Sequence, residues 1–357
     1  MAVQLTEEQE SAATKIREFL TAKTVDRQWL TMHGYAGVGK TSVLGHIARE
    51  FPWAWVATLT GRAADVLRKK TGANAYTLHS VFYKLKDKGL FQSGKERLKW
   101  DTVHRDGDLT GCALLLDECS MIDTTMAADI LRTGVRVIAC GDPGQLPPVN
   151  GEQFFKHPDI TLKTVHRQAL DSPILRQAHW IRLGRDYRSD GDGFQVVSQV
   201  SKEQLLEADV IMCWKNATRK AINHRVRFLK GIEKPNPQVG EKVLCLKNAG
   251  DFGLYNGATY ILTREFKEGD TTIYVEVDGI EEKVPYVRFE DMPDGLSKFD
   301  EMTTHFAFAE GMTVHKMQGN EEEIGILIDE YSRSDYRREW LYTATTRISK
   351  KITVIRR

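Results

Sequence analysis

The sequence has little cysteine and no long apolar run. Its five cysteines lie far apart without a C-x-x-C pair, a pattern typical of buried thiols in a reducing compartment rather than of a disulfide framework. No apolar stretch approaches the roughly 20 residues that span a bilayer. The acidic, polar start MAVQLTEEQE is unlike a secretory signal or a transit peptide. These absences predict a cytoplasmic protein with no membrane partner.

An excess of charge of either sign is also missing. Lysine and arginine number 50 against 49 aspartate and glutamate residues, for a net charge of +1. Composition therefore gives no argument for a nucleic-acid partner, although a groove can be basic in a neutral protein because counterion release is a local effect. With 41% hydrophobic and 28% charged residues over 357 positions, the chain is typical of a globular protein of two or three domains.

Apolar strand-like runs alternate with helical patterns in the first part of the chain. The expected strands are residues 29–33, 53–59, 112–116 and 135–140, and the expected helices are residues 40–50, 62–71 and 124–133. Alternation of this kind predicts an α/β fold, with a parallel sheet and crossover helices. Residues 84–108 interrupt it with a polar, Gly-containing stretch that we interpret as an inserted hairpin.

A second α/β region begins near Thr161, so we expect a first domain over residues 1–160 and a second over residues 161–357. Its expected strands are residues 210–214, 324–329 and 351–355. Residues 236–295 differ in texture, because their short β-like runs are broken by Gly and Asp. Short strands at such spacing predict a small barrel inserted into the second domain.

The segment from Gly34 to Thr41, GYAGVGKT, fits the phosphate-binding pattern G-x-x-x-x-G-K-T in full. It follows an expected strand and precedes an expected helix. This strand–loop–helix context favours a phosphate-binding loop over a Gly-rich turn that carries Lys-Thr by chance. Glycines let backbone N–H groups close on phosphates, and the helix N-terminus adds a favourable dipole. We expect Lys40 to contact the β- and γ-phosphates of ATP and Thr41 to ligate Mg²⁺. The predicted nucleotide-binding residues of this loop are Gly37, Val38, Gly39, Lys40, Thr41 and Ser42.

An apolar strand ends in Asp117-Glu118. In an open α/β sheet this places both carboxylates at the carboxyl edge, where ligands bind. We expect Asp117 to hold Mg²⁺ through water and Glu118 to activate the attacking water as general base. Two acids at a strand end can also be merely solvated, so the interpretation depends on the phosphate-binding loop. Together the two motifs predict ATP hydrolysis.

Six blocks of sequence resemble superfamily 1 helicases of the 5′-to-3′ branch, which includes RecD-like and Dda-type enzymes. They occur in the family's order at residues 34–41, 58–64 (TLTGRAA), 117–123 (DECSMID), 141–149 (GDPGQLPPV), 311–321 (GMTVHKMQGNE) and 341–347 (LYTATTR). The resemblance implies two RecA-like P-loop domains with parallel sheets, an SH3-like β-barrel in the second, and an ATP-dependent DNA helicase. It further implies single-stranded and forked DNA as partners, in a bacterial or phage-infected cell. The sequence names no protein partner and is compatible with a monomer.

The resemblance also assigns catalytic residues around the γ-phosphate. It implies that Gln145 senses the γ-phosphate and couples hydrolysis to domain movement. It places Arg347, which we expect within a helix of the second domain, and Arg167 across a cleft from the same phosphate. Guanidinium suits that role because it is planar, always ionised and bidentate. The plain alternative for each arginine is an ordinary surface position.

Gly319 and Glu321 lie in the block where the family's glutamate meets the ribose. This chain departs from the family there: Asn320 replaces a serine, Glu322 an aromatic residue and Met317 a small one. The detailed geometry of the family's block therefore carries over to these residues less directly than that of the other blocks.

Gln9 has two competing interpretations. Thr6-Glu7-Glu8-Gln9 is a capping box, with Thr6 as N-cap and Gln9 at the third helical position. The family instead uses a glutamine in this setting to recognise adenine. Because the segment matches the family's opening block, we expect adenine recognition.

By resemblance, single-stranded DNA would contact both domains. The predicted contacts are Thr60, Gly61, Arg62 and His79 in the first domain, and Thr313 and His315 in the second. Small residues at a helix start can hold a phosphate through backbone N–H groups. For His79 the alternative is a core or capping residue.

The insert that begins at residue 84 is basic and carries aromatic residues, a combination that suits phosphate contact and base stacking. The family places a strand-separating pin here, and Phe91 lies near the expected hairpin tip. The alternative is a solvated hairpin whose aromatics pack on the main domain. Without a pin, the chain would be a DNA-stimulated translocase that remodels complexes; an RNA substrate is a further alternative. Polarity follows from the resemblance and from the lack of an aromatic residue after Gln145.

Overall fold

The structure of the chain is a computed structural model. Contacts between residues divide it into unit 1, Met1–Leu59 with Ala63–Leu170, and unit 2, Thr60–Arg62 with Asp171–Arg357. The residues that the structure describes are 5–85, 100–102, 104, 107–148, 151–165, 171–246, 252, 254, 257–267, 270, 272–277, 279–285, 287–289, 304–333 and 335–356. Among them no helix is long and apolar enough to cross a membrane.

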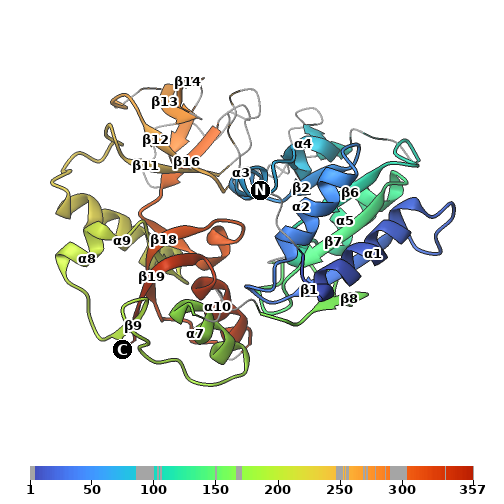
Figure 1. Cartoon of the computed structure of the whole chain (residues 1–357). Helices are drawn as coiled ribbons and strands as arrows, with labels where there is room; N and C mark the ends of the chain where they lie inside the picture. Colours follow the sequence, from blue (N-terminus) through green and yellow to red (C-terminus); the bar gives the residue numbers. More distant parts are fainter. Residues whose placement is uncertain are drawn as a thin grey trace. The chain divides into compact units, whose positions relative to one another are not determined.

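Six parallel strands form the sheet of unit 1, in the order β3-β2-β6-β7-β1-β8 (Figure 1). The strands are β1 (Trp29–Gly34), β2 (Trp55–Thr58), β3 (Ala75–Thr77), β6 (Ala113–Leu116), β7 (Arg136–Gly141) and β8 (Ile160–Leu162). Around them lie α1 (Glu7–Thr21), α2 (Lys40–Glu50), α3 (Gly61–Thr71), α4 (Leu78–Phe82), the 3-10 turn η1 (Cys119–Met121) and α5 (Thr124–Arg132). The predicted parallel α/β arrangement is confirmed.

The central strand β6 shows why the apolar runs of unit 1 form a two-sided sheet. Its four residues are all buried, and Leu115 packs into one hydrophobic cluster while Leu114 and Leu116 pack into another. Successive side chains of a strand point to opposite faces, so a continuous apolar run requires cover on both. Strand β8 pairs with β1 beyond the domain boundary expected after residue 160, and unit 1 continues to Leu170.

Unit 2 is built on a second parallel sheet, in the order β17-β10-β18-β19-β9. Its strands are β9 (Phe194–Val197), β10 (Val210–Cys213), β17 (Gly311–Thr313), β18 (Glu322–Ile328) and β19 (Ile348–Ile355). Its helices are α7 (Pro173–Arg182), α8 (Lys202–Glu207), α9 (Asn216–Leu229) and α10 (Arg337–Thr345), with the 3-10 turn η3 (Val314–Met317). Both described units thus present the carboxyl edge of a parallel sheet.

A mainly antiparallel sheet, here called the insert, interrupts unit 2 between β10 and β17. Its strands are β11 (Lys242–Cys245), β12 (Thr259–Leu262), β13 (Thr272–Val277), β14 (Ile280–Pro285), β15 (Val287–Phe289) and β16 (Thr304–Phe308), in the order β14-β13-β12-β11-β16-β15. Because β16 pairs with β11, the insert extends beyond residue 295, where the sequence predicts its end.

A two-stranded sheet closes the base of the expected hairpin in unit 1. Strands β4 (Tyr83–Leu85) and β5 (Trp100–Thr102) pair antiparallel, with Tyr83 opposite Thr102. Phe91 lies outside the described residues.

Candidate active site and nucleic-acid interface

The loop between β1 and α2 is tightly curled. Gly37 and Gly39 have φ angles of 84° and 81°, in the left-handed region that glycine adopts without steric cost. A Cβ on Gly34 would lie 2.5 Å from Cγ2 of Val38 and 3.1 Å from the carbonyl oxygen of Leu162. Three glycines are therefore required by the path of the loop, and α2 begins directly after it at Lys40.

Lys40 folds back over this loop. Its Nζ donates to the carbonyl oxygens of Gly34 at 2.7 Å and Tyr35 at 3.3 Å. The same nitrogen lies 3.9 Å from a carboxylate oxygen of Asp142, and the lysine side chain is 15% exposed. These contacts hold the ammonium beside the loop, where the motif predicts phosphate contact.

Asp117 and Glu118 follow β6 at the carboxyl edge of the sheet. The hydroxyl of Thr41 donates to Oδ2 of Asp117 at 3.5 Å, so the first residues of α2 meet the end of β6. Oδ1 of Asp117 accepts from the backbone N–H of Glu118 at 2.9 Å. Glu118 has a φ of 56°, a left-handed conformation that is costly for a residue with a side chain and is concentrated at functional sites.

The oxygens of Thr41 and Asp117 fit a Mg²⁺ ion. Burial and the neighbouring Glu118 carboxylate raise the pKa of Asp117 to about 6. A raised pKa means that the negative charge of this carboxylate is poorly compensated, and a bound divalent cation would compensate it. Among the described residues, no three His, Cys, Asp or Glu side chains form a metal cluster. Mg²⁺ sites in nucleotide-binding proteins commonly use one or two protein oxygens together with substrate phosphates.

Replacing Asp117 by asparagine should stabilise the nucleotide-free protein at pH 7.5. The folded pKa of Asp117, about 6, lies above the ordinary value of 3.8, so the folded state binds this proton more tightly than the unfolded state. The carboxylate therefore lowers the free energy of unfolding as pH rises through this window. We expect D117N to gain about 1–3 kcal/mol at pH 7.5 and almost nothing at pH 4, measured by denaturant unfolding in EDTA.

The exposed Asp192 provides the matched control: D192N should leave the free energy of unfolding unchanged at both pH values. Equal stability of D117N and the parent protein at pH 7.5 would contradict the charge imbalance inferred for this site.

Asp142 is a site residue that the sequence reasoning did not single out. It follows β7, is 2% exposed, and accepts the backbone N–H of Gly144 at 2.9 Å through Oδ1. Its backbone carbonyl accepts the N–H of Gln145 at 3.2 Å. Asp142 thereby shapes the turn that carries Gln145 and faces Lys40. The sequence feature that could have identified Asp142 is its position at the end of a buried strand, which is also the feature that identifies Asp117.

Gln145 is buried, and its side-chain Oε1 has no hydrogen-bond partner among the described residues. Buried polar atoms are nearly always paired, so an exception points to a function.

The side chain of Gln9 completes the capping box and also contacts the phosphate-binding loop. Its Oε1 accepts from the N–H of Thr6 at 3.0 Å, and its Nε2 donates to the carbonyl oxygen of Val38 at 3.1 Å. The side chain is 2% exposed. The sequence makes the two interpretations compete for this side chain, whereas in the structure capping and a place beside the nucleotide loop coexist. Adenine recognition stays a prediction.

In unit 2, two of the predicted blocks meet where β18 and β19 begin. The N–H of Glu322 donates to the carbonyl oxygen of Arg347 at 2.9 Å, which brings the block containing Gly319 and Glu321 against the block that ends in Arg347. Arg347 is buried, and it lies in the turn after α10 rather than within a helix as expected. The helix ends earlier because the chain must turn into β19. Arg167 lies outside the described residues.

The DNA contacts predicted for the first α/β domain lie at the ends of β2 and β3. Thr60 and Gly61 join β2 to α3, whereas the side chain of Arg62 lies outside the described part of the chain. His79 is half-buried in α4, its ring centroid is 5.4 Å from that of Tyr83, and burial lowers its pKa. A neutral His79 can hydrogen-bond to a phosphate but adds no charge.

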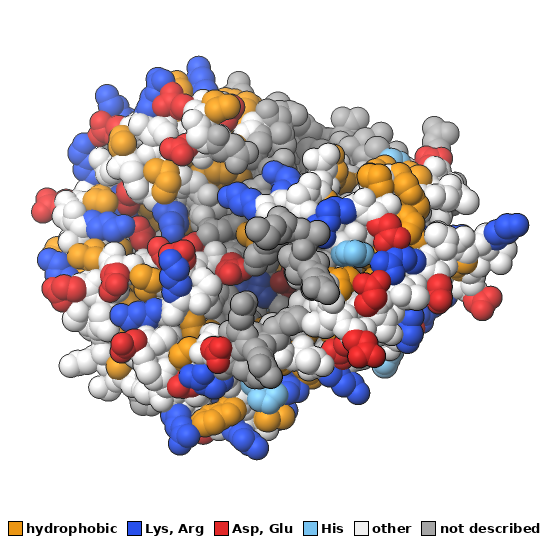
Figure 2. All heavy atoms as spheres, viewed as in Figure 1, with side chains coloured by type: hydrophobic (Ala, Val, Ile, Leu, Met, Phe, Trp, Pro, Cys, Tyr) orange, Lys and Arg blue, Asp and Glu red, His pale blue; other side chains and the backbone are white. Residues whose placement is uncertain are grey.

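The predicted contacts of unit 2 lie after β17. The hydroxyl of Thr313 accepts the N–H of Lys316 at 3.4 Å and so caps η3. Burial lowers the pKa of His315. On the face seen in Figure 2, basic and acidic side chains are interspersed over both units, as the balanced composition implies.

A curled glycine loop between strand and helix, with carboxylates at the same sheet edge, defines a P-loop nucleotide-binding protein. Residues 4–199, more than half of the chain, match the family model of an AAA domain, and the chain belongs to this family. Residues 308–355 match a UvrD-like helicase C-terminal domain. The resemblance to RecD-like superfamily 1 proteins is thereby confirmed.

Among curated proteins, the ATP-dependent RecD2 DNA helicase of Deinococcus radiodurans is 31% identical over 35% of this chain and 17% of its own length. The RecBCD enzyme subunit RecD of Mycolicibacterium smegmatis is 24% identical over 94% of this chain and 69% of its own. A probable conjugal transfer protein TraA of Sinorhizobium fredii is 26% identical, and the match covers 63% of this chain but 23% of that protein. Two of these three relatives are thus matched over less than a quarter of their length.

Solved structures share the fold. The crystal structure of Bacteroides Pif1 bound to ssDNA has a TM-score of 0.65 at 22% identity, covering 99% of this chain and 92% of that one. The Pif1 helicase of Candida albicans has a TM-score of 0.53 at 18% identity, covering 99% and 95%. The parallel-sheet α/β P-loop fold of this group is therefore shared by the chain.

Proposed function

We propose that the chain is an ATP-dependent DNA helicase that moves 5′ to 3′ along single-stranded DNA and separates duplex strands. The observation that carries the proposal is the meeting of Lys40, Thr41, Asp117 and Asp142 at one sheet edge. The match of residues 308–355 to a UvrD-like helicase C-terminal domain supports a second helicase domain. The ssDNA bound to the Bacteroides relative supports DNA as the substrate.

In the proposed reaction, Lys40 binds the β- and γ-phosphates and Glu118 takes a proton from the attacking water. Thr41 and Asp117 would hold Mg²⁺, and the bound ion would supply positive charge beside the phosphates. Gln145, whose buried Oε1 has no hydrogen-bond partner within the described part of the chain, would sense the γ-phosphate. The neighbouring loop atoms bind the nucleotide: Gly37, Val38, Gly39 and Ser42, with Gln9 at the adenine and Gly319 and Glu321 from unit 2.

Two arginines of the second half would stabilise charge on the γ-phosphate. Arg347 is buried beside the start of β18, and a buried guanidinium is pre-organised for such a contact. Arg167 is assigned by its motif. We place the single strand against Thr60, Gly61, Arg62 and His79 at the ends of β2 and β3, and against Thr313 and His315 after β17.

Unwinding of tailed duplexes tests the proposal. A duplex with a 5′ single-stranded tail should be separated when ATP and Mg²⁺ are present, whereas a 3′-tailed duplex should not. Oligonucleotide-stimulated ATP hydrolysis without strand separation would instead favour a translocase that remodels complexes. Hydrolysis stimulated only by RNA would move the substrate to RNA, and hydrolysis indifferent to any oligonucleotide would reject the helicase.

We propose that residues 84–108 form the strand-separating pin and that the insert is an SH3-like barrel. The antiparallel pairing of β4 with β5 supports a hairpin at this point of the chain. Replacing Phe91 by alanine should lower the unwinding rate about tenfold while ATP hydrolysis stimulated by single strands stays within about twofold, since stacking of one base is worth ~1–3 kcal/mol. Equal loss of both activities would reject the pin.

A further inference from the structure

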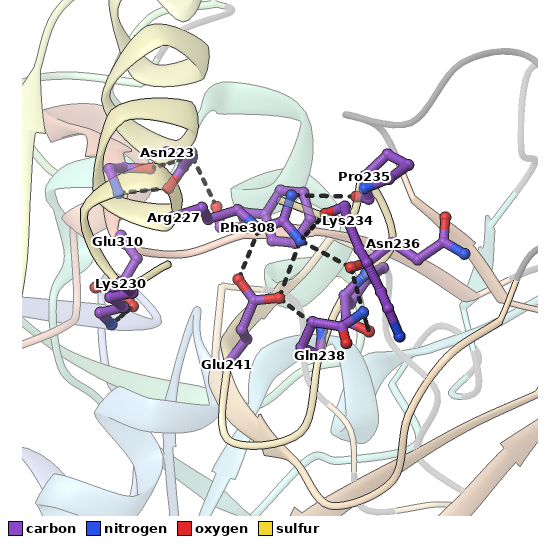
Figure 3. A network of polar contacts seen from close by, with 12 residues as sticks. Asn223, Arg227, Lys230, Lys234, Pro235, Asn236, Gln238, Glu241, Phe308 and Glu310 are labelled. Atoms are coloured by element: carbon purple, nitrogen blue, oxygen red, sulfur yellow. Dashed lines mark hydrogen bonds and ion pairs between the residues drawn. The ribbon is translucent and has the colours of Figure 1, made fainter. Parts of the chain in front are cut away.

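The insert is joined to the parallel sheet of unit 2 by buried polar contacts on α9 (Figure 3). The guanidinium of Arg227 donates to both carboxylate oxygens of Glu241, at 2.7 and 3.2 Å. It also donates to three successive carbonyl oxygens of the segment leading into β11. These acceptors are Lys234 at 2.9 Å, Pro235 at 3.1 Å and Asn236 at 2.7 Å.

The chain is held by the same helix where it leaves the insert. One turn before Arg227, the amide of Asn223 donates to the carbonyl oxygens of Phe308 at 3.1 Å and Gly311 at 3.2 Å, and accepts the N–H of Gly311 at 2.7 Å. The guanidinium of Arg227 also lies 4.2 Å from the ring centroid of Phe308. Both covalent connections of the insert are thus bound to one face of α9. We call Asn223, Arg227 and Glu241 the base clamp.

The chemistry of the base clamp favours orientation over stability. Arg227 is 8% exposed and Glu241 is 5% exposed, so forming their ion pair costs desolvation that apolar side chains would avoid. Directional hydrogen bonds to three adjacent carbonyls fix the direction of a chain segment, which packing alone does not. With its connections held, the insert has no free linker about which to swing.

A third contact joins the insert to the block that carries the predicted nucleotide and DNA residues. The side chain of Asn320 is 1% exposed, and its Nδ2 donates to the carbonyl oxygen of Gly257 at 2.9 Å and that of Lys316 at 3.3 Å. Gly257 has a φ of 85°, and its N–H donates to the carbonyl oxygen of Cys245 in β11. Asn320 thereby connects residues 311–321 to the first strands of the insert.

We propose that Asn320 is a positioning residue that makes the insert follow residues 311–321 during each ATP turnover, with the base clamp preventing independent rotation. This inference rests on the proposed helicase function. The serine that the family has at this position is one bond shorter than asparagine and would not reach the carbonyl oxygen of Gly257. The replacement of that serine by Asn320 therefore gives this chain a contact that a serine would not make.

The test compares Asn320→Ser with the parent chain in two measurements. We expect base pairs unwound per ATP hydrolysed to fall about fivefold, the factor that one neutral buried hydrogen bond represents, while ATP turnover on single strands stays within about twofold. In amide hydrogen exchange without nucleotide or DNA, peptides covering residues 242–262 should exchange faster in N320S, and those of unit 1 should not.

Matched variants separate this proposal from general damage. Asn216, exposed at the start of α9, gives the control N216S, which should behave as the parent. Glu241→Gln weakens the base clamp without touching Asn320 and should also lower base pairs unwound per ATP, whereas E281Q, in an exposed ion pair within the insert, should not. Unchanged coupling in both N320S and E241Q would overturn the proposal. A parent chain that neither hydrolyses ATP nor unwinds would reject the helicase function instead, and the exchange measurement would still report on the Asn320 contact.

Discussion

Replacing Lys40 by methionine is expected to lower ATP hydrolysis by at least about 10²–10³-fold, the loss typical when a positioned donor to developing charge is removed. Lysine at this position is already held by Gly34 and Tyr35 through their carbonyl oxygens and faces Asp142. Methionine keeps the apolar stem but removes the ammonium. The loss should therefore fall on turnover and phosphate binding rather than on the path of the loop.

Release of phosphate from ATP, with and without single-stranded DNA, measures this effect. The matched control is K156M: the Lys156 side chain is 45% exposed and pairs with the exposed Glu152, so turnover by K156M should equal that of the parent. Far-ultraviolet circular dichroism of K40M should be unchanged. A K40M protein that retained a tenth or more of parental turnover would remove Lys40 from the proposed reaction.

Glu118→Gln should strongly lower turnover while leaving nucleotide binding intact. The amide has the size of the carboxylate and can keep the left-handed backbone at φ 56°, but it cannot accept a proton from water. Loss of a general base costs about 10²–10⁴-fold in rate. The dissociation constant for a fluorescent ATP analogue should change less than about threefold, because the phosphate contacts of the loop remain.

Single-turnover hydrolysis and equilibrium titration of the analogue together separate the two effects. Glu152, with a side chain 84% exposed, supplies the control E152Q, for which neither quantity should move. If E118Q bound the analogue weakly as well, Glu118 would have to act in binding or in folding rather than as the base.

The phosphate-binding loop could be located from sequence because its requirements are local. Glycine is needed where φ is positive at Gly37 and Gly39, and the predicted helix over 40–50 matches α2. Both follow from residue type over a few neighbouring positions. Strand β6 was similarly evident, because a buried parallel strand must be apolar on both faces.

Features that depend on distant partners were not predictable in the same way. Asp142 belongs to the candidate site because its carboxylate faces Lys40, about a hundred residues earlier in the chain, and a contact at that separation leaves no local pattern in the sequence. The end of Gln9 that contacts Val38 could not be inferred from the capping pattern that explains its other end. The sequence does not predict strand β16, because its partner β11 lies at the other end of the insert.

The place of the insert also lengthens the loops that must close when unit 2 folds. Asn223 finds its partner Gly311 at a separation of 88 residues, and β10 pairs with β17 and β18, which come after the entire insert. Contacts this far apart in sequence slow folding, since a long loop must close before any pairing is gained. If the insert folds first, it brings residues 241 and 308 together and shortens that loop. The parallel sheet of unit 2 would then be completed last, after the insert has already formed.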